Sequence, residues 1–224
     1  MKAHQSGGVI ELKLSGVVRV LKEEGLGEAW VRLKQKMMVT SDIYEIDLNT
    51  LDEKKVEGEK TEYSITPMSA LLYHQMVEEN GSEIPPEKIK ILWERLDGNS
   101  TDRVYLLLDQ DGTIFGYYCV SYGDNVDVET NYVLKAAKGN AFLFDAYTFI
   151  PHRKKGAQKH ATIEILRMLQ QEGFETATVM IDKTNLYSQK ATLKYGFYKT
   201  GEVMHINLRF WKKNIERKFD RNDR

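Results

Sequence analysis

Residues 145–160 read DAYTFIPHRKKGAQKH, and this stretch decides how the rest of the chain is interpreted. It begins in an apolar strand, passes through a short basic turn that contains Gly156, and continues as a helix. The first N–H groups of a helix lack intrahelical partners, and the helix dipole adds about half a positive charge at that end. Arg153, Lys154 and Lys155 add charge, and the glycine lets the backbone approach a ligand closely. The turn therefore suits a phosphate or pyrophosphate.

A second interpretation of the same turn is a solvated basic loop that ends a strand. Two common phosphate motifs are absent from the sequence. No Gly-Lys-Ser/Thr ending marks a Walker loop, and no Gly-x-Gly-x-x-Gly marks a dinucleotide fingerprint. The turn by itself therefore leaves both interpretations open.

Hydrophobic periodicity on either side of this turn predicts alternating strands and helices. An amphipathic helix, or two helices hinged at Gly25-Leu26-Gly27, is expected over residues 17–38. Further helices are expected at 67–79, 86–96, 157–172 and 185–194. Strands are expected at 43–48, 61–66, 104–108, 114–120, 141–150, 176–181 and 202–211, with hairpin turns at 109–112 and 200–201. This order predicts a mixed α+β fold with one parallel crossover.

Composition narrows the functional classes. The chain has 224 residues and a formal net charge of -1, which gives no general argument for binding nucleic acid or an anionic membrane. Cys119 is the one cysteine, so an intrachain disulfide and a thiolate metal cluster are excluded, and we expect it to be buried. The five histidines show no metal-binding spacing, so we predict no metal. No apolar run is long enough for a transmembrane helix, and we expect a cytoplasmic protein.

Two segments together resemble the GNAT superfamily of N-acetyltransferases. Residues 153–158 resemble its pyrophosphate loop, Arg/Gln-x-x-Gly-x-Gly/Ala, and depart from it at Gln158. Residues 185–188, Asn-Leu-Tyr-Ser, followed by Gly-Phe eleven residues after the Asn, resemble a second element of that family. The resemblance covers roughly residues 42–211, and its specific motifs lie between 145 and 197.

The resemblance implies a fold and an activity. The fold would be a GNAT-like, mostly antiparallel central sheet flanked by helices, with residues 1–40 as a helical extension, 41–211 as the acetyltransferase domain and 212–224 as a charged tail. The activity would be direct transfer of an acetyl group from acetyl-CoA to a primary amine in a ternary complex. The acceptor would be a small molecule or a peptide, and a homodimer is possible. The extension could complete the acceptor pocket, dimerise or dock a partner.

The resemblance also implies where acetyl-CoA would bind. In the family the pantetheine arm enters a gap between two parting strands, pairs with the backbone of the first strand, and has its thioester carbonyl polarised by a backbone N–H. The residues implied in cofactor binding are Thr148, Phe149, Ile150, Arg153, Lys154, Lys155, Gly156, Ala157, Gln158, Asn185 and Ser188.

Asp145 and Tyr147 are the candidate catalytic residues. A carboxylate inside an apolar strand is unusual and could take a proton from the amine, but it could equally be a structural Asp bonded to backbone or to an arginine. Many family members place a tyrosine where this chain has Thr192, so Tyr147, and otherwise Tyr187, are the candidates for the acid. An alternative to catalysis is a sensor or scaffold that binds CoA or an acyl-CoA without turnover. Nucleic-acid binding through the basic turn is disfavoured, because aromatic and basic residues do not interleave.

Overall fold

The computed structural model describes residues 38–51, 63–96, 101–126, 132–208 and 211–219. The helices are α3 (Ala70–Asn80), α4 (Pro86–Glu94), α5 (Ala157–Gln171) and α6 (Leu186–Lys194). The strands are β1 (Met38–Asp47), β2 (Tyr63–Pro67), β3 (Asp102–Asp109), β4 (Ile114–Ser121), β5 (Asn125–Val126), β6 (Val133–Leu134), β7 (Asn140–Thr148), β8 (Thr176–Asp182), β9 (Tyr198–Leu208) and β10 (Trp211–Lys218). Three short 3-10 helices lie at Leu48–Thr50, Gly81–Glu83 and Ile150–His152.

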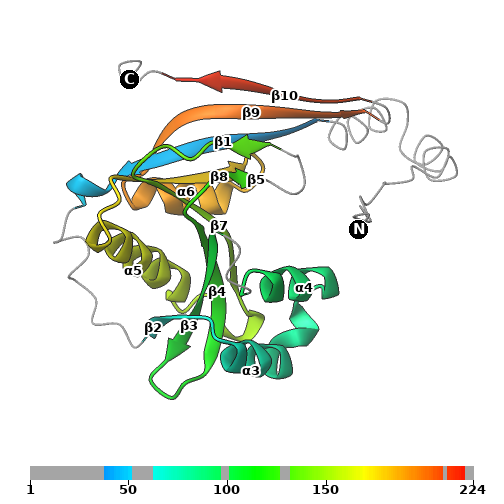
Figure 1. Ribbon diagram of the computed structural model, residues 1–224, viewed down its shortest axis with the longest axis vertical. Helices are drawn as coiled ribbons and strands as arrows, with labels where there is room; N and C mark the ends of the chain where they lie inside the picture. Colours follow the sequence, from blue (N-terminus) through cyan, green and yellow to red (C-terminus); the bar gives the residue numbers. More distant parts are fainter. Residues whose placement is uncertain (1–37, 52–62, 97–100, 127–131, 209–210, 220–224) are drawn as a thin grey trace, which may run out of the picture.

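One large sheet organises the molecule (Figure 1). Its strands lie in the order β10-β9-β1-β8-β7-β4-β3-β2, and β5 and β6 form a separate small hairpin. Every neighbouring pair in the large sheet is antiparallel except β7 and β8, which α5 connects. The expected α+β fold, with a mostly antiparallel sheet and one parallel crossover, is confirmed.

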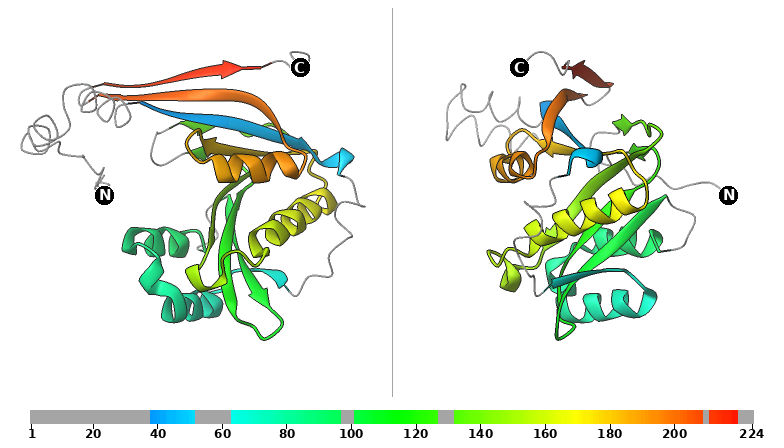
Figure 2. Two further views of the ribbon diagram at one scale, coloured as in Figure 1. Left: turned by 180° about the vertical axis from the view of Figure 1, so that it is seen from behind. Right: turned by 90° about the vertical axis from the view of Figure 1, so that its left-hand side faces the viewer.

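The position of β1 was not evident from the sequence. It lies inside the sheet, antiparallel to both β8 and β9, although the chain places it far from either. The strand that directly precedes α3 and α4 in the sequence is β2. It pairs with β3 and forms the edge of the sheet opposite β10. The two ends of the described chain therefore build one half of the sheet together (Figure 2).

The C-terminal region differs from the prediction. The expected turn at 200–201 is wrong, because β9 runs through it and the register with β1 shifts there, which is a bulge. Residues 211–218 form β10, a further antiparallel strand, where a charged tail was expected. Pro67 ends β2, and α3 begins only at Ala70, capped by the Ser69 hydroxyl, which accepts from the Leu72 N–H at 3.3 Å. The expected helix at 17–38 lies almost wholly outside the described residues.

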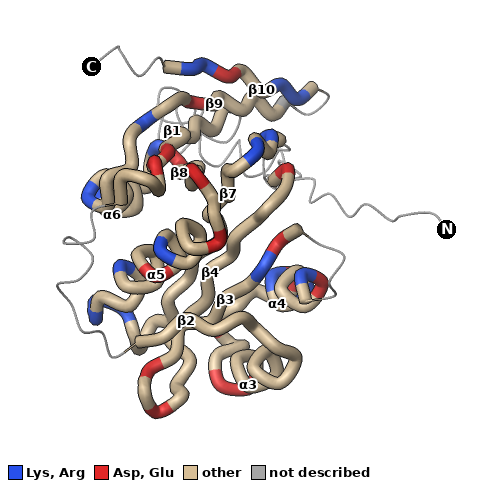
Figure 3. Tube along the Cα trace, turned by 60° about the vertical axis from the view of Figure 1, so that its left-hand side comes forward, with Lys and Arg blue, Asp and Glu red and all other residues tan. Residues whose placement is uncertain are grey.

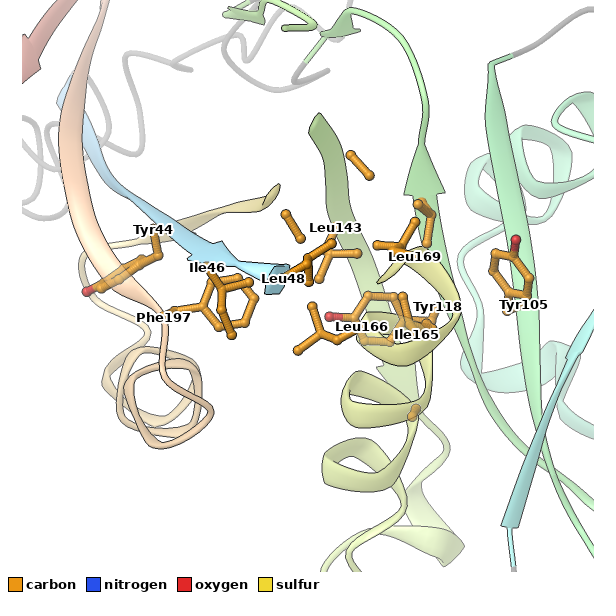
Figure 4. Close-up of a cluster of buried hydrophobic side chains, with 14 of the residues drawn as sticks. Tyr44, Ile46, Leu48, Tyr105, Tyr118, Leu143, Ile165, Leu166, Leu169 and Phe197 are labelled. Atoms are coloured by element: carbon orange, nitrogen blue, oxygen red, sulfur yellow. The ribbon is translucent and has the colours of Figure 1, made fainter. Parts of the chain in front are cut away.

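Helices cover both faces of the sheet (Figure 1). On one face, side chains of α3 and α4, including Met76 and Leu92, pack on β3, β4 and β7. On the other, α5 presents Ala161, Ile165 and Leu169 at intervals of four residues, all buried. In Figure 4 that second core runs from Leu169 of α5 through Leu48 and Ile46 to Phe197 beyond α6, and so joins the two halves of the sheet. Among the described helices, none is long and apolar enough to cross a membrane.

Candidate functional site

The two edges of β7 behave differently. On the β8 side, pairing covers four residues, Asn140 to Leu143, opposite Thr176 to Val179. Beyond Leu143 the two strands separate, while β7 continues to Thr148 along β4. The register with β4 shifts between Tyr117 and Cys119, and Asp145 opposite them has a positive φ of 50°, so β7 carries a bulge where it leaves β8.

A cleft of about 460 Å³ lies where β7 and β8 part. Its lining residues come from α4 and Arg95, from α5 and α6, and from the β5–β6 hairpin. Four of the predicted site residues line it: Asp145, Gln158, Asn185 and Ser188. Its other polar lining residues are Lys88, Arg95, Tyr118, Asn125, Thr162, Asp182, Tyr187, Thr192 and Tyr195.

The turn before α5 has the backbone geometry of an anion site. Gly156 caps the helix with φ at 81°, and Lys154 also has a positive φ, of 65°. A Cβ built on Gly156 would meet nothing within 4 Å, so the space in front of the helix is open. In the described part of the chain, the N–H groups of Ala157 and Gln158 have no acceptor. Two outward N–H donors and the helix dipole therefore face that space.

Aromatic side chains hold the turn in place. The Tyr63 hydroxyl donates to the Lys155 carbonyl at 3.3 Å, and the Lys155 ammonium lies 5.5 Å from the centre of the Phe115 ring. Arg153 is turned the other way: its Nε donates to the Thr148 carbonyl at 2.9 Å, and its guanidinium lies over the Tyr147 ring. Of the three basic residues, Arg153 is thus engaged with the end of β7 and not with the front of α5.

Gln158 lies where the family loop has glycine or alanine. Its side-chain Oε1 accepts from the Thr148 hydroxyl at 3.0 Å, which ties the first turn of α5 to the end of β7. The side chain therefore occupies one end of the cleft that it lines. Sequence alone identified the departure but not its partner.

Asn185 and Ser188 meet at the start of α6. The Asn185 carboxamide oxygen accepts from the Ser188 N–H at 3.1 Å, so Asn185 acts as the N-cap of the helix. Because both residues also line the cleft, capping and ligand contact are compatible. Thr192, one turn later, is buried against the same cleft.

Asp145 is an ion-paired residue. Its Oδ2 accepts from Lys88 Nζ and from Arg95 Nη1, both at 2.8 Å. Arg95 also lies 3.2 Å from Cys119 Sγ and 3.5 Å from Asp102. The carboxylate is only 17% exposed and lines the cleft. Asp145 thus has the arginine contact of the structural interpretation, with a lysine in addition, and its catalytic role stays a prediction.

Tyr147, Phe149 and Ile150 lie away from the cleft. The Tyr147 ring packs on Tyr117 and Phe149 on the face covered by α3 and α4, and its hydroxyl lies 3.5 Å from Glu83. The Phe149 N–H donates to the Phe115 carbonyl and the Ile150 N–H to Glu83. These backbone donors are therefore already used, and the position of Tyr147 argues against its predicted catalytic role.

Burial controls the ionisation of two groups near the bulge. Burial raises the pKa of Tyr118 to about 12, partly offset by a hydrogen bond to Thr162, so this cleft phenol stays protonated at neutral pH. Burial also raises the pKa of the Cys119 thiol well above its usual value, despite the nearby Arg95. The expectation that Cys119 is buried is confirmed.

Lys88 and Arg95 were missed in the sequence, although a signal was present. They are seven residues apart in a predicted helix, so two turns separate them on one face. The predicted strand at 141–150 contains one charged residue, Asp145, which needs such a partner. Figure 3 shows the basic positions of α4 beside the strands of the sheet. The β5–β6 hairpin was also missed, because its strands are only two residues long.

Comparison with known proteins supports the fold alone. No protein-family model and no curated protein matches the chain. A functionally unknown conserved protein from Staphylococcus epidermidis is similar in structure, with a TM-score of 0.56 and 9% identity over 81% of this chain and 68% of that one. A tandem GNAT protein from the clavulanic acid biosynthesis pathway gives a TM-score of 0.54 at 13% identity, over 84% of this chain and 58% of that one.

A third similar structure is a GCN5-related glucosamine N-acetyltransferase region of a fungal multi-domain β-N-acetylglucosaminidase. It gives a TM-score of 0.54 at 11% identity, over 85% of this chain and 22% of that one. The chain has the GNAT fold. In this chain the parting of β7 from β8 and the bulge at Asp145 lie within a sheet of that fold, and the open turn follows β7.

Proposed function

We propose that this chain is an N-acetyltransferase that carries an acetyl group from acetyl-CoA to a primary amine. The observation that carries the proposal is the open edge of β7 beyond Leu143, next to the uncapped N–H groups of α5. The catalytic unit would extend over residues 38–218, because both β1 and β10 pair within the sheet.

For acetyl-CoA, we assign the pyrophosphate to the turn at Gly156. The N–H groups of Ala157 and Gln158 would donate to it, and the exposed Lys154 and Lys155 would supply charge. Arg153 would hold the end of β7, given its contact with Thr148.

The pantetheine arm would lie along the open edge of β7 near Ala146 and Thr148, and not reach Phe149 or Ile150, whose N–H groups are occupied. Asn185 and Ser188 would contact it from the start of α6. The arm would thus pass through the cleft from the α5 side toward Asp145.

The chemistry is a direct displacement. The neutral amine nitrogen attacks the thioester carbon, the C–S bond breaks, one amine proton is lost, and the thiolate leaves as CoA thiol after gaining a proton. A backbone N–H at the bulge would stabilise the oxyanion. Asp145 would accept the proton, directly or through water, by its second oxygen, because Oδ2 is held by Lys88 and Arg95.

A sensor or scaffold that binds CoA without turnover is the second candidate. It is favoured by Thr192, buried where many family members have a tyrosine, and by the Gln158–Thr148 hydrogen bond at one end of the cleft. A departing thiolate can leave without an enzymic acid, so these features weigh less than the open edge of β7.

Titration calorimetry with acetyl-CoA, with CoA and ATP as controls, tests the cofactor assignment. Micromolar binding of acetyl-CoA with no response to ATP is the expected result. A thiol-release assay with a panel of amines then separates the two candidates. Amine-dependent release identifies an enzyme, whereas binding without release identifies the sensor, and no binding refutes both.

A further inference from the structure

We call the part of the cleft next to α4 its acceptor side. Two cations and one carboxylate line it: Lys88, Arg95 and Asp145. Lys88 of α4 and Arg95, the residue that caps the C-terminus of that helix, both donate to Asp145 Oδ2 at 2.8 Å. Beside them Phe142 and Phe144 project from the same face of β7 and line the cleft. Aromatic side chains and a charged cluster therefore line the same cleft.

Lys88 and Arg95 differ in how many hydrogen-bond donors each has left for a ligand. The Arg95 side chain is 10% exposed and is engaged by Asp145, by Asp102 and by Cys119, with its guanidinium 4.8 Å from the centre of the Phe144 ring. The Lys88 side chain is 30% exposed, and among the described residues Asp145 is its one partner. An ammonium has three donors, so two remain for a ligand in the cleft.

Asp145 also keeps one oxygen for a ligand. Its Oδ2 accepts both bonds, and within the described ranges no donor contacts Oδ1. Since Lys88 and Asp145 are 2.8 Å apart, the cleft presents a positive group directly beside a negative one. The complement of that pair is a small zwitterion whose amine and carboxylate are equally close together.

We propose, on the basis of the acetyltransferase function above, that the acceptor is an amino acid with an apolar side chain, and that Lys88 determines this specificity. The carboxylate of this amino acid accepts a hydrogen bond from Lys88, and its amino group lies at Asp145 Oδ1. Its apolar side chain packs on Phe142 and Phe144. Asp145 takes one proton from the ammonium and releases it to solvent before attack, and the second proton, lost on transfer, passes through the same carboxylate to the departing thiolate. The balanced products are the N-acetyl amino acid, CoA thiol and one released proton.

Matched acceptor pairs test this inference. Leucine, methionine and phenylalanine are each compared with the amine that lacks only the carboxylate: 3-methylbutylamine, 3-methylthiopropylamine and 2-phenylethylamine. For the unsubstituted protein we expect kcat/KM to favour at least one amino acid over its amine by tenfold or more. Equal or better use of every amine would overturn the inference.

Lys88→Met tests the residue, with Lys90→Met as its control. Lys90 lies on the same helix, is 78% exposed and pairs only weakly, at 3.7 Å, with Glu94. Lys88→Met should lower the preference for the carboxylate at least tenfold, because the KM of the amino acid rises more than the KM of its matched amine. A fall in kcat from the lost contact with Asp145 should be common to both members of a pair, and Lys90→Met should keep the preference. Equal losses on both members of a pair would mean that Lys88 only supports the structure, which would contradict the assignment.

The outcomes separate this inference from the proposed function. Transfer to carboxylate-free amines without preference leaves the acetyltransferase assignment standing and refutes the amino-acid acceptor. Acetyl-CoA binding with no transfer to any amine refutes both.

Discussion

The two edges of β7 contrast sharply. Its β4 edge is closed: all eight residues of β4 are buried, and a Cβ built on Gly116 would lie 2.1 Å from the Tyr147 carbonyl oxygen. Its β8 edge is open beyond four residue pairs. One strand thus serves both as a fixed element of the core and as an exposed backbone edge, so structure and binding are divided between its two sides.

The open edge persists because other contacts hold the two halves together. Leu48 and Ile46 of the N-terminal part pack with Ile165 and Leu169 of α5, across the line where β7 and β8 part (Figure 4). Burial of such side chains contributes roughly 1.5–3 kcal/mol each. Strand β1 and the 3-10 helix after it therefore contribute to the core that joins the two halves of the sheet beside the proposed site.

Gly116→Ala should have the largest effect, since it breaks the closed edge. The new methyl group would collide with backbone, so we expect a loss of about 3 kcal/mol in the free energy of unfolding. Urea denaturation measures it. Gly81→Ala is the control, because the nearest atom to its Cβ is a side-chain carbon at 3.4 Å. Similar stabilities of the two variants would contradict the close approach of β4 and β7.

Asp145→Asn should lower kcat about a hundredfold, the usual scale for a lost general base. Asparagine tolerates the positive φ at this position and keeps the bulge. Acetyl-CoA affinity should change little, by calorimetry. Asp102→Asn is the control, because Asp102 contacts Arg95 outside the cleft lining. A turnover rate that is unaffected at every pH would make Asp145 purely structural.

Gly156→Val should weaken acetyl-CoA binding about tenfold, or about 1.4 kcal/mol, by filling the space before α5. Gly173→Val is a matched control at the other end of the same helix. Its φ is 86°, close to the 81° of Gly156, and its Cβ would also meet nothing within 4 Å. Both variants carry the same backbone strain, so equal affinities would remove the anion site from the turn.

The smallest effect is expected for chemical labelling of the Cys119 thiol. Because burial raises its pKa and leaves it inaccessible, the native protein should react with a thiol reagent only as fast as it unfolds. Reaction with Ellman's reagent, with and without denaturant, measures this. Fast labelling of the native protein would contradict the burial of Cys119 and the close packing of β4.

The sequence was most informative where local signals decide the structure. Both ends of α5 were predicted because a glycine lies at each, and the hairpin of β3 and β4 because its turn residues are explicit. The place of β1 was not predictable, since strand pairing between distant segments leaves no local pattern. At 200–201 the glycine marks a bulge and not a turn. A Cβ on Gly201 would lie 2.9 Å from the Arg217 carbonyl of β10. Strand β10 was not predicted because its sequence is highly charged.

The residues of the candidate site stay a prediction, and they differ in how far the local sequence decides their positions. The turn before α5 and Asn185 followed from their spacing, whereas the partners of Asp145 depend on how α4 packs on β7. The surroundings of Tyr147 could not be predicted, because its packing on Tyr117 depends on how β7 pairs with β4.

Hydrogen exchange measured with and without acetyl-CoA tests the central claim most directly. If the open edge of β7 binds the cofactor, amides at 144–148 and 157–159 should become protected when acetyl-CoA is added, while amides of β4 stay unchanged. Protection confined to other segments, at a concentration where calorimetry shows full binding, would contradict the account.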